Sequence, residues 1–391
     1  MDLTEPRARA AFRAEVREWL AANIPSRPLP SLDTEAGFAA HRDWERLMAD
    51  AQMAVVTWPE RFGGRGVDLI DWLIFEEEYW AAGAPVRVSQ NGIFLLAPTI
   101  FEFGTEEQKA RYLPPMARAD EVWSQGWSEP GAGSDLAALR SKATKVAGGW
   151  RLSGQKTWST RAVYADWMFG LFRSDPDSTR HRGLTYFLFP LTAPGVSVRP
   201  IRQLDGEPGF AEVFLDDVFV PDDDVDQGGV LGEVGAGWKV AMSTTTSERG
   251  LTLRSPGRFL ASARRLVDLY RSAEADQPAA AAANADAVVQ AWMDAEAYRL
   301  YVLGTALRAL DGHPIGAESS ANKLFWSVLD IDIHRTALAL LGERATLTGD
   351  PVSEPWLDGY QFALAGPIYA GTNEVQRNLI AERVLGLPRS G

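Results

Sequence analysis

The feature that most constrains this fold is the spacing of apolar residues, which changes twice along the chain. Up to about residue 120, apolar side chains recur at helical spacing, as in Phe12, Val16, Trp19 and Leu20. From there to about residue 235, short alternating runs are separated by Gly, Pro or Asp turns, a pattern typical of strands. Helical spacing returns at about Trp238 and continues to the end of the chain. The order is therefore helical, then β, then helical.

This order predicts an α+β multidomain protein. We expect an N-terminal all-α domain over residues 1–120, a central antiparallel β-barrel over residues 121–235 and a C-terminal four-helix bundle over residues 236–391. Several short strands without intervening helices favour an antiparallel barrel or sandwich over a parallel sheet. A length of 391 residues is sufficient for two or three domains with a sizeable core.

Composition excludes several classes of partner and chemistry. A net charge of −13 argues against nucleic acid or an anionic membrane as the main partner. The absence of cysteine excludes disulfides, thiolate metal sites and a cysteine nucleophile. The histidines are scattered and show no metal-ligand spacing, so no metal is expected (His41, His181, His313 and His334). No secretory signal and no apolar run of ~18 residues is present, which predicts a cytoplasmic protein without a membrane span.

A Gly-rich string, QGWSEPGAGSD, covers residues 125–135. Its glycines allow the backbone to approach a ligand closely, and Ser128, Ser134 and Asp135 add short polar side chains beside exposed backbone N–H groups. Such a loop suits a ligand rich in acceptors, such as a flavin ring or a phosphate. The string matches neither a P-loop nor the Gly-x-Gly-x-x-Gly of a dinucleotide fold. A surface turn is the alternative, and for a short motif taken alone it is the more common outcome.

A second motif, GQKTWST, covers residues 154–160, on or beside a predicted strand. The indole of Trp158 offers a flat face for an isoalloxazine ring, and a hydroxyl directly after it can bond a ring nitrogen. A Trp in a strand, taken alone, is more often a core residue, because most buried aromatics simply pack. The two motifs together are more specific than either one.

These two strings and a third, IYAGTNEVQRN at residues 368–378, resemble the three ordered signatures of the acyl-CoA dehydrogenase flavoprotein family. The resemblance extends over essentially the full chain. It implies FAD as cofactor, an acyl-CoA as substrate and electron-transfer flavoprotein as acceptor. The implied reaction removes a proton α to the thioester carbonyl and passes the β-hydrogen to FAD as hydride, giving a 2-enoyl thioester. The implied context is lipid metabolism, by β-oxidation of fatty acids or steroid side chains.

The resemblance also implies which residues contact the cofactor. In the Gly-rich string these are Gln125, Trp127, Ser128, Gly133 and Ser134, with Ser134 also near the thioester. From the second motif, Trp158, Ser159 and Thr160 pack on the ring and bond near its reactive nitrogen. From the third, Thr372, Asn373 and Glu374 contact the other end of the cofactor.

The general base of this chain is expected at a different position from that in most relatives. Most relatives carry it as Glu in a Tyr-Glu-Gly-Thr segment, but here that position is Ala370, whose methyl group cannot take a proton. Some relatives place the Glu on a helix directly before an Arg, and Ser247-Glu248-Arg249 matches that arrangement. We therefore expect Glu248 as the catalytic base, in a pocket dry enough to raise its pKa, with Ser247 and Arg249 on the substrate side. The alternative is a structural or solvated Glu–Arg pair.

Two other segments depart from the family pattern. Relatives hold the FAD of a neighbouring subunit through Arg-x-x-Phe-Gly and Gln-x-x-Gly-Gly segments. Residues 272–278 of this chain, SAEADQP, contain no arginine, and residues 340–344, LLGER, keep one glycine and no glutamine. An oligomer is expected, and the departures predict that full FAD occupancy requires a related subunit in a mixed tetramer. Arg271 or Arg344 reaching the pyrophosphate is the alternative. The rival functions are a catalytically silent partner subunit and an acyl-CoA oxidase.

Overall fold

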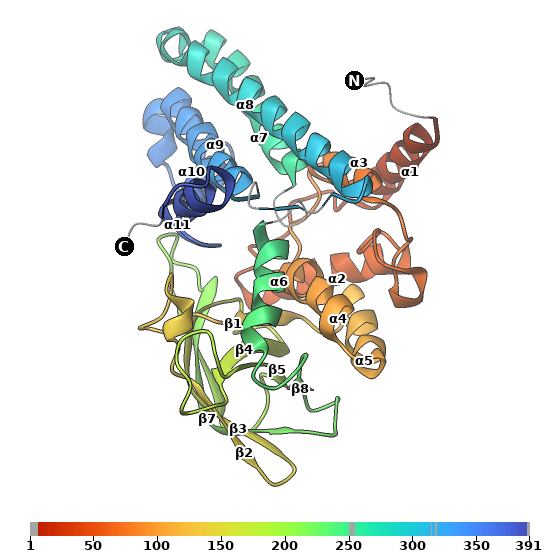
Figure 1. Cartoon of the computed structure of the whole chain (residues 1–391). Coiled ribbons are helices and arrows are strands. Elements are labelled where there is room, and N and C mark those ends of the chain that lie inside the picture. The colour runs from red at the N-terminus through yellow and green to blue at the C-terminus, as the bar shows by residue number, and fades with distance from the viewer. Residues whose placement is uncertain (1–6, 250–254, 314, 317–318, 389–391) are drawn as a thin grey trace. The chain divides into compact units, whose positions relative to one another are not determined.

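The computed structural model describes residues 7–249, 255–313, 315–316 and 319–388, with only the backbone described for residues 246–249 (Figure 1). The chain divides into two compact units. One comprises Met1–Pro25, Val67–Ala84 and Arg249–Gly391, and we call it the helical unit. The other comprises Ser26–Gly66 and Pro85–Glu248, and we call it the sheet unit.

The sheet unit is built on eight strands. These are β1 (Trp123–Gly126), β2 (Lys142–Val146), β3 (Gly149–Thr160), β4 (Trp167–Arg173), β5 (Leu184–Pro190), β6 (Val196–Ile201), β7 (Phe210–Pro221) and β8 (Gly229–Val230). Their order in the sheet is β6-β7-β3-β2-β4-β5-β8, and β1 adds to β4. Strand pairing does not close this sheet, so the expected barrel is not confirmed. Most pairs are antiparallel as expected, but β1 and β2 both run parallel to β4.

The sheet core consists of aromatic and branched side chains. Phe172, Phe187 and Phe189 from β4 and β5 are fully buried, together with Leu152 from β3 and Val213 from β7. Full burial of each such side chain contributes about 1.5–3 kcal/mol. This core fixes the positions of β3 and β4, and β1, which leads into the Gly-rich string, pairs with β4.

Helices of the sheet unit pack beside these strands. They are α2 (Glu35–Asp50), α4 (Ala97–Phe103), α5 (Glu106–Ala117) and α6 (Gly237–Arg249), with a π-helical turn η2 (Asn91–Leu96) before α4 and short 3₁₀ turns η1 (Glu60–Phe62) and η3 (Leu136–Ala138). Helix α5 begins with a capping box between Thr105 and Gln108. Helix α6 is joined to α4 by a buried hydrogen bond of 2.8 Å between the hydroxyls of Thr244 and Thr99.

The helical unit groups α9 with α7, α8, α10 and α11, and α3 with α1 and α7. Its members are α1 (Arg7–Asn23), α3 (Leu69–Ala81), α7 (Pro256–Asp276), α8 (Pro278–Leu310), α9 (Ser319–Leu341), α10 (Glu354–Ala363) and α11 (Asn373–Leu379), with short turns η4 (Gly342–Thr346) and η5 (Ile380–Val384). Phe259, Tyr298 and Trp326 form its aromatic core. The alanine-rich residues 279–285 belong to α8 and are helical. Pro256 lies in the first turn of α7, where its missing N–H costs nothing.

The two units cut across the three sequence segments. Helices α1 and α3 group with the C-terminal helices, whereas α6 groups with the sheet. The compact units therefore do not follow the expected domain boundaries at residues 120 and 235. Those boundaries separate sequence segments and stay a prediction. Within the described residues, no helix is long and apolar enough to cross a bilayer.

Candidate active site

A strained, exposed tryptophan marks the end of strand β3. Lys156 pairs with Val213 and Ser159 with Ala211, so β3 contains one extra residue between these two pairs, which is a β-bulge. Within this bulge Trp158 adopts a φ of +58°, and 58% of its surface is exposed. A bulky residue at positive φ is an outlier, and such strain gathers at ligand sites. The bulge therefore presents a flat apolar face to solvent at an energetic cost.

Unsatisfied polar groups lie in or directly after the strands next to this tryptophan. Gln125 Nε2, Trp127 Nε1 and Ser159 Oγ are buried and have no hydrogen-bond partner among the described residues. Ser124 Oγ donates to the Thr160 carbonyl at 2.8 Å, which joins β1 to the end of β3. Each unpaired buried group costs about 1–3 kcal/mol. A ligand with acceptor atoms would satisfy these groups.

The Gly-rich string forms a tight turn after β1. Glu129 and Ala132 exchange two backbone hydrogen bonds of 3.0 Å, and Thr157 N–H donates to the Ser128 carbonyl at 2.9 Å. A Cβ added at Gly131 or Gly133 would meet no atom within 4 Å, so this side of the turn is open.

The two polar residues that close the string differ in their contacts. Ser134 is exposed. The Asp135 carboxylate is also exposed and accepts from Arg180 at 2.9 Å. This ion pair makes Asp135 less available to a ligand than Ser134.

A buried ion pair, which the sequence analysis did not single out, joins the turn to β3. Lys156 Nζ donates to Glu129 Oε1 at 2.8 Å and to the Leu171 carbonyl at 2.7 Å. Burial disfavours the ionised carboxylate, but the charge of Lys156 and its hydrogen bond hold the pKa of Glu129 below its usual value. Burial lowers the pKa of Lys156, and Glu129 opposes this effect. A lysine within a strand is ordinarily expected at the surface, so the sequence does not indicate that Lys156 is buried.

The third motif lies at the start of α11 in the helical unit. Thr372 Oγ1 accepts from the Val375 N–H at 3.3 Å and caps this helix. Asn373 is buried, and its Oδ1 accepts from Lys323 Nζ at 2.7 Å and from Ser327 Oγ at 3.2 Å. Lys323, fully buried on α9, is a second residue that the sequence analysis missed.

Glu374, by contrast, is exposed. Its carboxylate lies 3.5 Å from Arg377. Hydrogen bonds from its own backbone N–H and from Thr372 hold its pKa below the usual value.

Helix α6 carries the expected base. Its backbone is helical to Arg249, and position 248 is one turn beyond Thr244. Thr244 is buried and, besides Thr99, lies 3.3 Å from the Tyr186 hydroxyl. The side chains of Ser247, Glu248 and Arg249 lie outside the described residues. Their expected roles therefore stay predictions.

Arg271 and Arg344, the alternative residues for binding the FAD pyrophosphate, both have acidic partners. Arg344 donates to both oxygens of Asp350, at 2.8 and 2.9 Å. The hydrogen bond from Arg344 holds the pKa of Asp350 well below its usual range. Arg271 is exposed and lies 3.4 Å from Asp268. Residues 272–276 continue α7 without a basic side chain.

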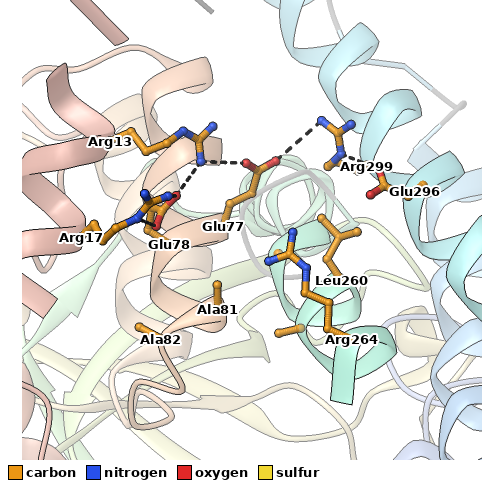
Figure 2. A pocket seen from close by; sticks show the side chains of 12 residues that line it. Arg13, Arg17, Glu77, Glu78, Ala81, Ala82, Leu260, Arg264, Glu296 and Arg299 are labelled. Atoms are coloured by element: carbon orange, nitrogen blue, oxygen red, sulfur yellow. Dashed lines mark hydrogen bonds and ion pairs between the residues drawn. The ribbon is translucent and has the colours of Figure 1, made fainter. Parts of the chain in front are cut away.

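A cavity of about 580 Å³ lies in the helical unit, between α1, α3, α7 and α8 (Figure 2). Arg13 and Arg17 from α1 face Glu77 and Glu78 from α3, with Arg13 at 2.8 Å from Glu78. Burial raises the pKa of Glu78, but the hydrogen bonds from both arginines outweigh it, and the pKa lies below the usual value. None of the predicted site residues whose side chains the structure describes lines this cavity. Its carboxylates are paired internally, which is typical of a structural network.

The described part of the chain holds no group of three or more His, Asp or Glu side chains arranged to bind a metal ion. His334 is buried on α9, and its Nδ1 lies 2.7 Å from the Asp330 carbonyl. Burial lowers the pKa of His334. This residue therefore packs as a core histidine.

Comparison with known proteins defines the class. Family models of the acyl-CoA dehydrogenase N-terminal, middle and C-terminal domains match residues 6–120, 124–218 and 235–385. The chain therefore belongs to the acyl-CoA dehydrogenase family, whose members are flavin-dependent oxidoreductases, and the resemblance drawn from the three motifs is confirmed.

Particular relatives are similar over nearly the whole chain. Acyl-CoA dehydrogenase IpdE1 of Mycobacterium tuberculosis is 39% identical over 389 residues, and that of Mycolicibacterium smegmatis is 40% identical over 397 residues, with 97% of each chain covered. Among solved structures, the Tcur3481-Tcur3483 steroid ACAD matches with a TM-score of 0.85 and 27% identity over both chains in full. The ChsE4-ChsE5 complex from Mycobacterium tuberculosis matches with a TM-score of 0.84 and 30% identity, also over both chains in full.

Proposed function

We propose that this chain catalyses FAD-dependent α,β-dehydrogenation of an acyl-CoA to the 2-enoyl-CoA, with Glu248 as the base that removes the Cα proton. FAD supplies the acceptor for the hydride that leaves Cβ. The observation that carries the proposal is the exposed, strained Trp158 beside the unsatisfied donors of Gln125, Trp127 and Ser159. An aromatic face next to unpaired donors is the environment that a flavin ring, apolar on its faces and rich in acceptors at its edge, requires.

The chain's residues fit this cofactor in the sheet unit. Trp158 would pack against the ring, while Gln125, Trp127 and Ser159 would donate to its edge. Thr160 directly follows Ser159 on β3, and Ser128 and Gly133 belong to the turn that contains Trp127. The exposed Ser134 is available to the thioester. We assign all of them to the flavin and substrate site.

The third motif is assigned to the other end of the cofactor. Because the Asn373 side chain is bonded to Lys323 and Ser327, we expect Asn373 to contribute through its backbone. Thr372 and Glu374 would contribute their exposed atoms.

Glu248 is a better base than the alternatives. Ala370 carries no ionisable group, and the exposed Glu374 has a lowered pKa, which weakens it as a proton acceptor. Glu248 follows the small, buried hydroxyl residues Thr244 and Thr245 on α6, and these are suitable lining for a substrate channel. Ser247 and Arg249, its neighbours, are proposed to contact the substrate.

The substrate and partners follow from chemistry and from relatives. An acyl-CoA with a fatty or steroid side chain is proposed, since one similar structure is named a steroid ACAD. Electron-transfer flavoprotein is proposed as the acceptor, and the cytoplasm as the location. An oxidase is the rival, and consumption of oxygen with release of peroxide during turnover would favour it over a dehydrogenase.

Removal of the Trp158 indole tests the cofactor contact. Trp158→Ala is expected to lose FAD during purification or dialysis, because the ring loses its stacking face. Flavin content per chain, measured by absorbance, gives the answer. Phe219→Ala is the matched control, since Phe219 is an exposed aromatic near the other end of the β3–β7 pair, opposite Arg151. An unchanged flavin content and spectrum in the Trp158 variant would count against the contact.

A further inference from the structure

We propose that the buried Glu129–Lys156 ion pair is a positioning device for the flavin site. It fixes the register of the β3 bulge and holds the Gly-rich turn against it, so that Trp158 and the neighbouring donors stay in the orientation that the ring requires. This inference rests on the proposed flavin site and assigns a role to two residues that need not touch the cofactor themselves.

The pair connects four segments of the sheet unit. Lys156 on β3 reaches Glu129 in the turn and the Leu171 carbonyl on β4, and its Nζ lies 4.7 Å from the centre of the Phe172 ring. Glu129 in turn accepts from the backbone N–H groups of Arg140 and Ser141, at 2.6 and 2.9 Å, in the segment directly before β2. The side chains are 0% and 8% exposed, so solvent does not replace these bonds.

The pair explains why the bulge falls where it does. In a regular strand, side chains two positions apart point to the same face. Lys156 is fully buried, yet Trp158 is largely exposed. The extra residue between the Lys156 and Ser159 pairs reverses the face for Trp158. Glu129 holds the ammonium group of Lys156 in the interior. A one-residue shift in the register of β3 would turn Trp158 inward, but it would also move the charge of Lys156 away from Glu129.

The same pair also fixes the turn. The Thr157 N–H, next to Lys156, donates to the Ser128 carbonyl, next to Glu129. The ion pair and this backbone bond are therefore adjacent links between the turn and β3. Both links lie within three residues of the unpaired Trp127 Nε1 and Ser159 Oγ groups.

A contribution to stability does not by itself explain why the chain contains this buried ion pair. A buried ion pair pays a large desolvation cost, and its replacement by apolar side chains of similar size is often neutral or stabilising. Loss of one partner, by contrast, leaves an uncompensated buried charge and is strongly destabilising. A double substitution that removes both charges therefore separates stability from positioning.

The test compares Glu129→Gln, Lys156→Met and the double variant in the full chain, in whichever assembly the wild-type protein retains FAD. Apoprotein is titrated with FAD by quenching of flavin fluorescence, and visible circular dichroism reports the orientation of the bound ring. Denaturant unfolding of the apoprotein reports stability. Asp330→Asn, which removes a buried carboxylate paired with Arg258 at 2.8 Å in the helical unit, is the matched control.

We expect each single variant to be less stable and to bind FAD at least ~10-fold more weakly. Losses of this size are typical when a residue that orients the ligand-binding side chains, without touching the ligand, is replaced. The double variant is expected to recover stability but not FAD affinity or the wild-type dichroism. A double variant that binds FAD with wild-type affinity and dichroism would overturn the positioning role. The control variant is expected to lose stability without losing FAD affinity, and an equal loss of affinity there would also overturn it.

A milder variant covers the case in which the single variants do not fold. Glu129→Asp keeps the carboxylate that compensates Lys156 but is one methylene shorter, so it shifts the turn without leaving an unpaired charge. We expect weaker FAD binding with near-normal stability, and wild-type affinity would contradict the inference. Failure of the proposed function is distinguishable: without a flavin site the wild-type protein itself binds no FAD, and without dehydrogenation the wild-type protein binds FAD but acyl-CoA does not reduce it.

Discussion

The Glu248→Gln variant is expected to retain FAD and to lose at least ~10²-fold in the rate at which an acyl-CoA reduces the flavin, the low end for loss of a general base. Glutamine has nearly the same shape as glutamate, so binding and packing are preserved while the proton acceptor is removed. Rapid mixing of the holoprotein with acyl-CoA under anaerobic conditions measures this rate directly.

Glu374→Gln is the matched control for this experiment. Glu374 is exposed, has a lowered pKa and lies beside Arg377, so in protein saturated with FAD its loss is expected to leave the rate of flavin reduction nearly unchanged, although FAD binding itself is expected to weaken. Near-normal reduction in the Glu248 variant together with a large loss in the Glu374 variant would move the base to Glu374.

A second large effect is expected in cofactor occupancy. The chain purified alone should hold well under one FAD per chain, and co-purification with a related subunit that carries the missing arginine should restore full occupancy in a mixed tetramer. The FAD pyrophosphate is doubly charged and is costly to bury without donors. The stretch at residues 272–277 offers no basic side chain, and Glu274 and Asp276 would repel the phosphates.

Substitution of Arg271 and Arg344 decides whether one of these residues or a partner subunit binds the FAD pyrophosphate. Arg344 is bonded to Asp350 through two hydrogen bonds, so its use for phosphate would require loss of that pair. Arg271 is exposed and less firmly held. If Arg271→Ala and Arg344→Ala leave FAD content unchanged, neither residue completes the site. A homo-oligomer of the wild-type chain with about one tightly bound FAD per chain, active on acyl-CoA, would contradict the mixed tetramer.

The surface of α8 supports assembly with another chain. Val289, Met293, Leu300 and Leu307 are all exposed and follow one another at intervals of four and seven residues. This spacing places them along one stripe of the helix. A row of exposed apolar side chains along one helix face is typical of a protein–protein interface. The similar structures named Tcur3481-Tcur3483 and ChsE4-ChsE5 each join two named components.

Strand positions were readable from the sequence because short, mostly apolar runs between turn residues are a local pattern. Three of the short runs between residues 120 and 235, at residues 167–172, 184–189 and 196–201, correspond to β4 (Trp167–Arg173), β5 (Leu184–Pro190) and β6 (Val196–Ile201). Full burial of β4 and β5 did not obscure them, since Gly, Pro and Asp turns bound each run.

Long-range features were not readable in this way. The grouping of α1 and α3 with the C-terminal helices depends on packing between segments far apart in the chain. The bulge that exposes Trp158 depends on where Lys156 finds its partner, and a lysine gives no local sign of burial. The motifs could indicate which residues form the candidate site, but the strain and the unpaired donors emerge only from the packed sheet.

Anaerobic titration of the purified holoprotein with an acyl-CoA tests the central proposal most directly. Bound flavin colours the protein yellow, and hydride transfer from the substrate bleaches that colour. We predict that the visible flavin absorbance falls on addition of acyl-CoA, with formation of the 2-enoyl-CoA in equal amount. A wild-type assembly that contains FAD and keeps its full visible spectrum in the presence of excess fatty acyl-CoA and steroid acyl-CoA substrates would contradict it.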